Sequence, residues 1–205
     1  MKTLIKICGI KDLAEAGMAI KNGADILGFN LVKTSKRYIE PKVAKNIIKK
    51  IDRRKVEIAG VFQNEEKEKD IEITDFLKLD LVQLHGEEEP EIYRRLKTKI
   101  IKVFPVERDF DVDKLLLEMK QSKADFYLLD RRNQGSGERI DVEKARRVAE
   151  KFSLFLAGGL NPENVKKVVE KVKPYAVDVA SGVESDGRKN MVKIQKFIRM
   201  VRSIS

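Results

Sequence analysis

The chain has 205 residues, of which 42% are hydrophobic and 37% are charged. That length suffices for one sizeable core and is short for two, so we expect a single domain spanning residues 1–205. No apolar run approaches the ~18 residues of a membrane span, and a strand-like run stands where a signal peptide would, which predicts a cytoplasmic protein with no membrane partner. The single cysteine, Cys8, excludes an internal disulfide.

The excess of basic residues has two interpretations, a nucleic-acid-binding surface or a bias toward small anionic ligands. The chain carries 43 Lys and Arg against 33 Asp and Glu, a net charge of +10. These charges are scattered and interleaved with glutamates, as in residues 65–70, and tryptophan is absent. Nucleic-acid-binding surfaces concentrate their charge, so we expect small anionic ligands and no nucleic-acid partner.

Apolar runs typical of buried strands alternate with stretches of helical periodicity along the whole chain. Strict alternation indicates a parallel sheet, and eight strand–helix units allow that sheet to close, so we predict an α/β fold, a (β/α)8 TIM barrel with short loops. An open doubly wound sheet is the alternative; no G-x-G-x-x-G follows the first strand, which disfavours its dinucleotide-binding form. The expected strands cover residues 4–8, 26–31, 56–62, 81–84, 100–104, 126–130, 154–157 and 175–180.

Start and stop signals accompany this alternation. Asp12 and Glu15 have the spacing of a capping box at the first helix. Asn161, followed by Pro162, predicts a helix that begins there. Pro105 predicts the end of the fifth strand, because proline has no N–H to donate to a neighbouring strand.

Glycine-containing turns follow the last two expected strands. One turn holds Gly158 and Gly159, and the other holds Ser181 and Gly182. Neighbouring parallel strands present such turns at one edge of the sheet, with backbone N–H groups that no side chain obstructs. Either turn alone fits an ordinary connection. Together they predict a phosphate site, because bare N–H groups stabilise anions and TIM barrels often bind phosphate after strands 7 and 8.

Polar residues at the carboxyl ends of the strands are candidate catalytic groups, because TIM barrels place their active sites there. Cys8 ends the first strand, where a nearby cation would lower its pKa and make it a base; a small buried hydrophobe is the alternative role. Asp130 ends the sixth strand and is either the matching acid or a cap for the next turn.

Arg37 and His85 lie on loops at the same expected edge. The planar guanidinium of Arg37 suits a substrate carboxylate, although a solvated loop arginine is the commoner case. His85 is the only histidine, and a hydrogen bond within its loop is at least as good an explanation as a catalytic role. Because there is neither a second histidine nor a Cys/His cluster, we expect no metal site.

Eight motifs, in order along nearly the whole chain, resemble those of the phosphoribosylanthranilate isomerases. The combination of KICGI, QLHG and SGVE is specific for that family. The resemblance implies a (β/α)8 barrel and a cofactor-independent Amadori rearrangement of N-(5-phospho-β-D-ribosyl)anthranilate to 1-(2-carboxyphenylamino)-1-deoxy-D-ribulose 5-phosphate, a step of tryptophan biosynthesis. The motifs are KICGIK (6–11), SKRYI (35–39), GVFQN (60–64), VQLHGEE (82–88), LLD (128–130), GSG (135–137), AGGLNPENV (157–165) and VDVASGVE (177–184).

The resemblance also implies a role for each candidate residue. Cys8 would be the general base that removes the sugar C2 proton, and Asp130 the general acid that protonates the ring oxygen. Arg37 would hold the anthranilate carboxylate. The further substrate-binding positions would be His85 and Asp178, and the phosphate-binding positions Gly158, Gly159, Ser181 and Gly182.

Two other functions stay open at this point. One is a sister barrel that isomerises a histidine-pathway aminoaldose, which is disfavoured because such enzymes resemble a barrel with an aspartate in place of Cys8. The other is a non-catalytic barrel that binds phosphate or nucleic acid, which the net charge suggests. The loop 131–139 is a candidate lid over the substrate, and the protein is expected to be a monomer or a homodimer.

Overall fold

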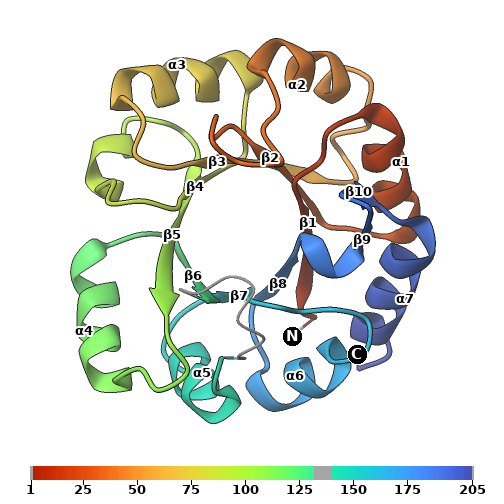
Figure 1. Cartoon of the computed structure of the whole chain (residues 1–205). Helices are drawn as coiled ribbons and strands as arrows, with labels where there is room; N and C mark the ends of the chain where they lie inside the picture. Colours follow the sequence, from red (N-terminus) through yellow and green to blue (C-terminus); the bar gives the residue numbers. More distant parts are fainter. Residues whose placement is uncertain (1, 132–139, 205) are drawn as a thin grey trace.

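The structure is a computed structural model that describes residues 2–131 and 140–204. Eight parallel strands, β1 to β8, follow one another in chain order and close into a barrel. Figure 1 looks along the barrel and shows the strands as an inner ring with the helices outside it. The predicted TIM barrel is confirmed.

The elements follow the predicted alternation closely. The barrel strands are Leu4–Cys8 (β1), Ile26–Asn30 (β2), Glu57–Phe62 (β3), Leu81–Leu84 (β4), Lys99–Val106 (β5), Phe126–Arg131 (β6), Leu154–Leu156 (β7) and Ala176–Val179 (β8). The α-helices are Leu13–Asn22 (α1), Pro41–Ile48 (α2), Lys67–Leu77 (α3), Val112–Ser122 (α4), Val142–Ala149 (α5), Val165–Val172 (α6) and Met191–Arg202 (α7). Short additions are the 3-10 helices Pro90–Tyr93 (η1) and Ser181–Val183 (η2) and the hairpin strands Glu184–Ser185 (β9) and Arg188–Lys189 (β10).

The strand bounds agree with the sequence prediction to within one residue except in β5, and one expected helix is replaced. Pro105 does not end β5, which continues to Val106, with Pro105 opposite Asp130 in the register with β6. A proline is tolerated there because it lies next to the end of its strand. The segment after β4 forms only the 3-10 helix η1, which starts at Pro90, instead of the expected α-helix.

The predicted capping box at the start of α1 is confirmed, whereas α6 begins later than predicted. The N–H of Glu15 donates to Asp12 Oδ1 at 2.8 Å, as the capping box predicts. The helix α6 begins at Val165 and not at Pro162. Asn161 instead caps the turn before that helix, where its Oδ1 accepts the N–H groups of the two residues following Pro162 at 3.0 Å each.

Alternation along the strands sorts side chains between the barrel interior and the helix layer. Most of the interior is apolar. One polar group interrupts it, formed by Lys6, Gln83 and Asp178 from β1, β4 and β8, all of them buried. Interior apolar side chains are Ile26, Ala59, Leu81, Ile101, Val103, Phe126, Leu128, Phe155, Ala157 and Ala176.

Aspartates fasten the amino-terminal end of the barrel. Each lies just before or at the start of an even-numbered strand and accepts a backbone N–H from the odd-numbered strand before it. This repeated hydrogen bond ties neighbouring strands together at one end and leaves the other end free for the site. The pairs are Asp25 with Ile5 (2.7 Å), Asp80 with Ile58 (2.7 Å) and Asp125 with Ile100 (2.8 Å).

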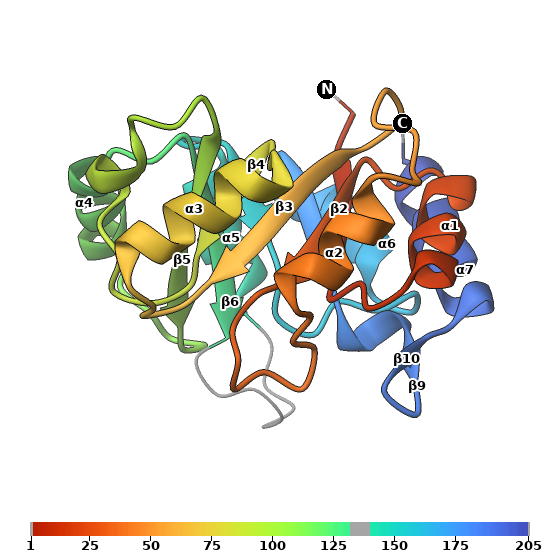
Figure 2. The same cartoon turned by 90° about the horizontal axis from the view of Figure 1, so that it is seen from above.

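The two ends of the barrel carry different segments, as Figure 2 shows. Both chain termini lie at the end where the strands begin. The β9–β10 hairpin and the segment that follows β2 lie at the opposite end, where the strands finish. That opposite end is the one at which TIM barrels build active sites.

Candidate active site

Four of the candidate side chains lie toward the end of the barrel at which the strands finish. Cys8 is the last residue of β1. Asp130 and Asp178 are each the last residue but one of their strands, β6 and β8. His85 directly follows β4. The charge of Asp178 acts on the pKa values of Cys8, His85 and Asp130 alike, so these groups lie around one mouth.

Cys8 is buried against the neighbouring strand. Gly28, its register partner in β2, leaves the space for the thiol: a Cβ at that glycine would lie 2.8 Å from Cys8 Sγ. Burial raises the pKa of Cys8; the positive charge of Lys6 lowers it, Asp178 raises it and Lys189 lowers it. The balance is a raised pKa, so the predicted net lowering by a nearby cation is wrong, although both cations act in the predicted direction.

Asp130 and His85 are electrostatic neighbours with opposite shifts. Burial raises the pKa of Asp130, while the N–H of Arg131, which donates to Asp130 Oδ1 at 2.7 Å, and the nearby His85 both lower it. The net result is a raised pKa, which favours a carboxyl group that keeps its proton. Burial lowers the pKa of His85 and so favours the neutral imidazole.

Lys6 and Gln83 were not predicted as site residues. Lys6 Nζ donates to Asp178 Oδ2 and to Gln83 Oε1, both at 2.8 Å, inside the barrel. A charged residue two positions before Cys8, in a run that is otherwise apolar, was the signal that would have identified Lys6.

Arg37 is held by a glutamate that the sequence analysis also missed. Its Nε and Nη2 donate to Glu184 Oε1 and Oε2, each at 2.8 Å. Its side chain runs across Gly9, where a Cβ would lie 2.4 Å from Arg37 Cδ. Lys189 Nζ, almost fully buried, donates to the same glutamate at 2.7 Å. Glu184 is the last residue of the SGVE motif, which was the available signal.

The two glycine turns lie against each other, as the phosphate prediction requires. A Cβ on Gly182 would lie 1.9 Å from Leu160 O, directly after the first turn. Gly158 and Gly159 have φ angles of +82° and +85°, which side chains rarely tolerate. Within the described residues, the amides of these two glycines donate to no backbone oxygen.

Arg131 adds a positive charge to this turn and was not predicted. A Cβ on Gly159 would lie 3.1 Å from Arg131 Cζ, so the guanidinium covers the glycine backbone. Bare amides and an arginine are the groups that bind phosphate. The remaining member of the predicted set, Ser181, starts η2 beside them.

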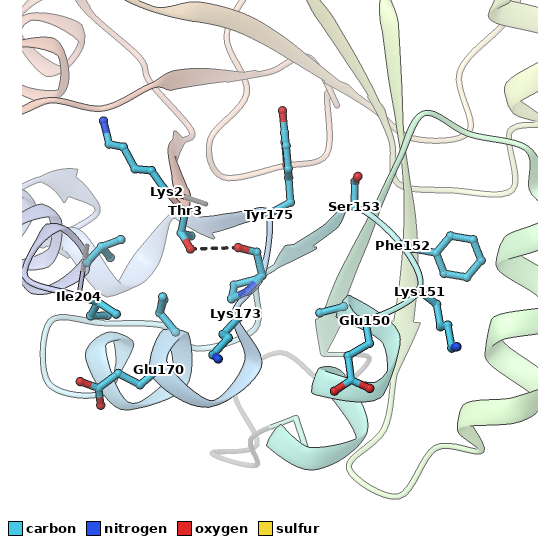
Figure 3. A pocket seen from close by; sticks show the side chains of 14 residues that line it. Lys2, Thr3, Glu150, Lys151, Phe152, Ser153, Glu170, Lys173, Tyr175 and Ile204 are labelled. Atoms are coloured by element: carbon cyan, nitrogen blue, oxygen red, sulfur yellow. Dashed lines mark hydrogen bonds between the residues drawn. The ribbon is translucent and has the colours of Figure 1, made fainter.

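A separate pocket of about 650 Å³ lies at the other end of the barrel. Its lining includes Thr3, Ser153 and Tyr175, which directly precede β1, β7 and β8 (Figure 3). Thr3 Oγ1 donates to Pro174 O at 3.0 Å across this pocket. It contains none of the candidate residues, and that end of a TIM barrel serves stability.

Some expectations concern parts of the chain that the structure does not cover. Of the candidate lid, residues 131–139, all but Arg131 fall outside the described residues, and so does the GSG motif. Across residues 2–131 and 140–204, no group of three or more His, Cys, Asp or Glu is arranged to hold a metal ion. In the same part of the chain, no helix has both the length and the apolar character needed to cross a membrane.

Comparison with known proteins gives a consistent result over the full chain. A family model described as N-(5'phosphoribosyl)anthranilate (PRA) isomerase matches residues 5–200. The N-(5'-phosphoribosyl)anthranilate isomerase of Geobacter sp. (strain M21) is 40% identical, over 99% of this chain and 100% of the relative.

Solved structures agree with the sequence match. The phosphoribosyl anthranilate isomerase of Thermotoga maritima has a TM-score of 0.88 at 37% identity, over 98% of this chain and 99% of that one. Another, in complex with reduced 1-(o-carboxyphenylamino)-1-deoxyribulose 5-phosphate, has a TM-score of 0.85 at 36% identity, with the same shares covered. The resemblance drawn from the motifs is confirmed, and the chain belongs to the N-(5'-phosphoribosyl)anthranilate isomerase family.

Proposed function

We propose that Cys8 and Asp130 perform, as general base and general acid, the Amadori rearrangement that defines this isomerase family. The observation that carries the proposal is the shared mouth: a thiol from β1 and a carboxyl from β6 both lie within electrostatic reach of Asp178, at the end of the barrel that carries the two adjacent glycine turns. The reaction moves protons within one substrate, and acid and base side chains are sufficient for it.

The first step opens the sugar. The carboxyl group of Asp130 donates its proton to the ring oxygen, the C1–O bond breaks, and the anthranilate nitrogen lone pair forms a C1=N double bond. The raised pKa of Asp130 favours the protonated acid that this step needs. Asp130 is left as a carboxylate near His85.

The second step transfers the double bond. The Cys8 thiolate removes the proton from C2, whose electrons form C1=C2 while the C=N electrons return to nitrogen. The resulting enolamine loses its enol proton and gains a proton at C1, which gives the ketone. Because the pKa of Cys8 is raised, its thiolate is a strong base once formed.

The anionic ends of the substrate match the cationic and amide groups around the mouth. Arg37 is proposed to hold the anthranilate carboxylate, since its guanidinium is permanently charged and donates hydrogen bonds to carboxylates. Gly158, Gly159, Ser181 and Gly182 are proposed to hold the phosphate through their backbone. His85 is proposed to lie near the substrate without being essential, and Asp178 to have a supporting role.

The test is turnover by the purified chain, followed by loss of the fluorescence of phosphoribosylanthranilate. Cys8→Ala and Asp130→Asn are each expected to lower kcat by about 10²–10⁴ with little change in KM. Retained kcat in either variant contradicts the role of that residue. A folded wild-type chain that turns over only a histidine-pathway aminoaldose supports the sister barrel, and one that binds phosphate without turnover supports the non-catalytic barrel.

We further propose a cytoplasmic monomer or homodimer that recognises no nucleic acid. The absence of a nucleic-acid partner is supported by the scattered +10 charge, because no long basic run in the sequence concentrates it. Sedimentation of the pure chain distinguishes monomer from dimer. Retention on duplex DNA at 0.15 M salt would contradict the absence of a nucleic-acid partner.

A further inference from the structure

Lys6 is a charged side chain with no exposure to solvent, placed in the interior of the barrel. Removing an ammonium group from water is costly unless other groups compensate it. Two of its three N–H donors are used by Asp178 Oδ2 and Gln83 Oε1, at 2.8 Å each. This construction fixes the position of the charge, since its partners come from two other strands.

The fixed charge lies next to the proposed base. Lys6 and Cys8 are two residues apart on β1, so their side chains point to the same, interior face of the barrel. The positive charge of Lys6 favours the thiolate form of Cys8 and so opposes the burial that keeps the thiol protonated.

We propose that Lys6 is a positioning residue for the base: its buried ammonium group stabilises the Cys8 thiolate that removes the C2 proton, against the burial that favours the thiol. The inference rests on the proposed role of Cys8. Asp178 serves it indirectly, because its carboxylate holds the ammonium group in place.

Other charged groups face Cys8 from the surrounding elements. Lys189 of β10 also favours the thiolate, but it hydrogen-bonds with Glu184, which takes up part of its charge. Arg37 also interacts with Cys8, and it too is paired with Glu184. Asp178 opposes the thiolate. Lys6 is therefore the favourable charge that the barrel interior itself provides.

The single cysteine allows a direct test. Thiolate absorbance near 240 nm is titrated from pH 6 to 10, with the Cys8→Ala form of each variant as the blank, which removes the tyrosine contribution. A nearby opposite charge shifts a pKa by about 1–3 units, so Lys6→Met is expected to lower the thiolate fraction by about tenfold or more at any pH below the wild-type midpoint of the titration. An unchanged fraction, within about twofold, overturns the inference.

The matched control is Gln83→Met. This variant removes the 2.8 Å hydrogen bond between Lys6 Nζ and Gln83 Oε1 and keeps the positive charge of Lys6. The thiolate fraction of this variant is expected to stay within about twofold of wild type, because the shift comes from the charge. A loss as large as that of Lys6→Met would show that Lys6 acts through packing alone and would overturn the inference.

A replacement variant and a turnover measurement distinguish failure of the Lys6 inference from misfolding and from failure of the proposed role of Cys8. If Lys6→Met fails to fold, judged by circular dichroism, Lys6→Gln replaces it, because its amide can still donate to Asp178 and carries no charge. If Cys8→Ala retains turnover, the proposed base is wrong whatever the titration shows. If Cys8→Ala abolishes turnover and the Lys6 variants titrate like wild type, only the role of Lys6 is wrong.

Discussion

Arg37 and Glu184 form a two-point ion pair at the mouth of the barrel, although 147 positions separate them in the chain. Burial alone would raise the pKa of Glu184, but the hydrogen bonds from Arg37 and Lys189 lower it to about 2. Glu184 is therefore ionised throughout the working pH range. It fixes the Nε and Nη2 side of the guanidinium. Within residues 2–131 and 140–204, Nη1 donates no hydrogen bond and is available for a ligand.

The first prediction concerns this pair. Glu184→Gln is expected to raise KM about tenfold, equivalent to about 1.4 kcal/mol, with a small effect on kcat, because an amide holds the guanidinium less firmly than a carboxylate. The measurement is steady-state kinetics on phosphoribosylanthranilate. Glu163→Gln, which breaks an exposed pair with Lys196, is the control and should change neither constant. A lower KM in Glu184→Gln would show instead that Glu184 competes with the substrate carboxylate.

The second prediction concerns the glycine turn after β7. Gly159→Val is expected to weaken competitive inhibition by inorganic phosphate by about tenfold or more, because a side chain at φ +85° strains the turn and its Cβ meets Arg131. Inhibition constants measured for phosphate provide the comparison. Gly17→Ala is the control, since a Cβ there meets nothing within 4 Å. Equal inhibition of Gly159→Val and wild type would count against the phosphate site.

The residues that the sequence predicted are those whose placement follows from local pattern. Cys8 ends β1 and Asp130 lies one residue before the end of β6. The closing of eight strands brings strand ends to one mouth, so their position follows without knowledge of any contact. The glycine turns are equally local. Pro105 and Pro162 were misjudged for a related reason: tertiary pairing carries β5 past a proline, and a capped turn precedes α6.

The residues that the sequence did not predict depend on contacts between distant strands. Lys6 lies 77 positions from Gln83 and 172 from Asp178, so its interior position is visible only in the closed barrel. The predicted direction of the pKa shift of Cys8 was wrong for the same reason. The pattern indicated a nearby cation but could not weigh it against burial, which is the larger effect.

The third prediction concerns the aspartate at the start of the fourth strand–helix unit. Asp80→Ala is expected to lower the free energy of unfolding by about 1.5–3 kcal/mol, because the N–H of Ile58, in a buried strand, loses a charged acceptor at 2.7 Å. For a chain of this size that lowers Tm by roughly 3–12 °C. Asp113→Ala, which removes an exposed pair with Arg147, should have a much smaller effect. A stability equal to wild type would show that β3 and β4 hold together without this hydrogen bond.

The fourth prediction concerns Asp70, a buried carboxyl group of α3 outside the active site. Tyr93 donates to Asp70 Oδ2 at 2.8 Å, and Asp70 Oδ1 has no hydrogen-bond partner within the described residues. Burial raises the pKa of Asp70 to about 6. The folded protein therefore binds this proton more tightly than the unfolded chain does.

The sign of the pH effect follows from that difference. Its contribution to stability is complete below the ordinary aspartate pKa of about 3.9 and is lost as pH rises through about 6, a loss of roughly 2–3 kcal/mol. Asp70→Asn mimics the protonated form, so unfolding measured by denaturant at pH 5 and pH 8 should find the variant more stable than wild type chiefly at pH 8. Asp75→Asn, on the exposed side of α3, should show no such difference. An equal effect of Asp70→Asn at both pH values would mean that Asp70 does not change its protonation between them.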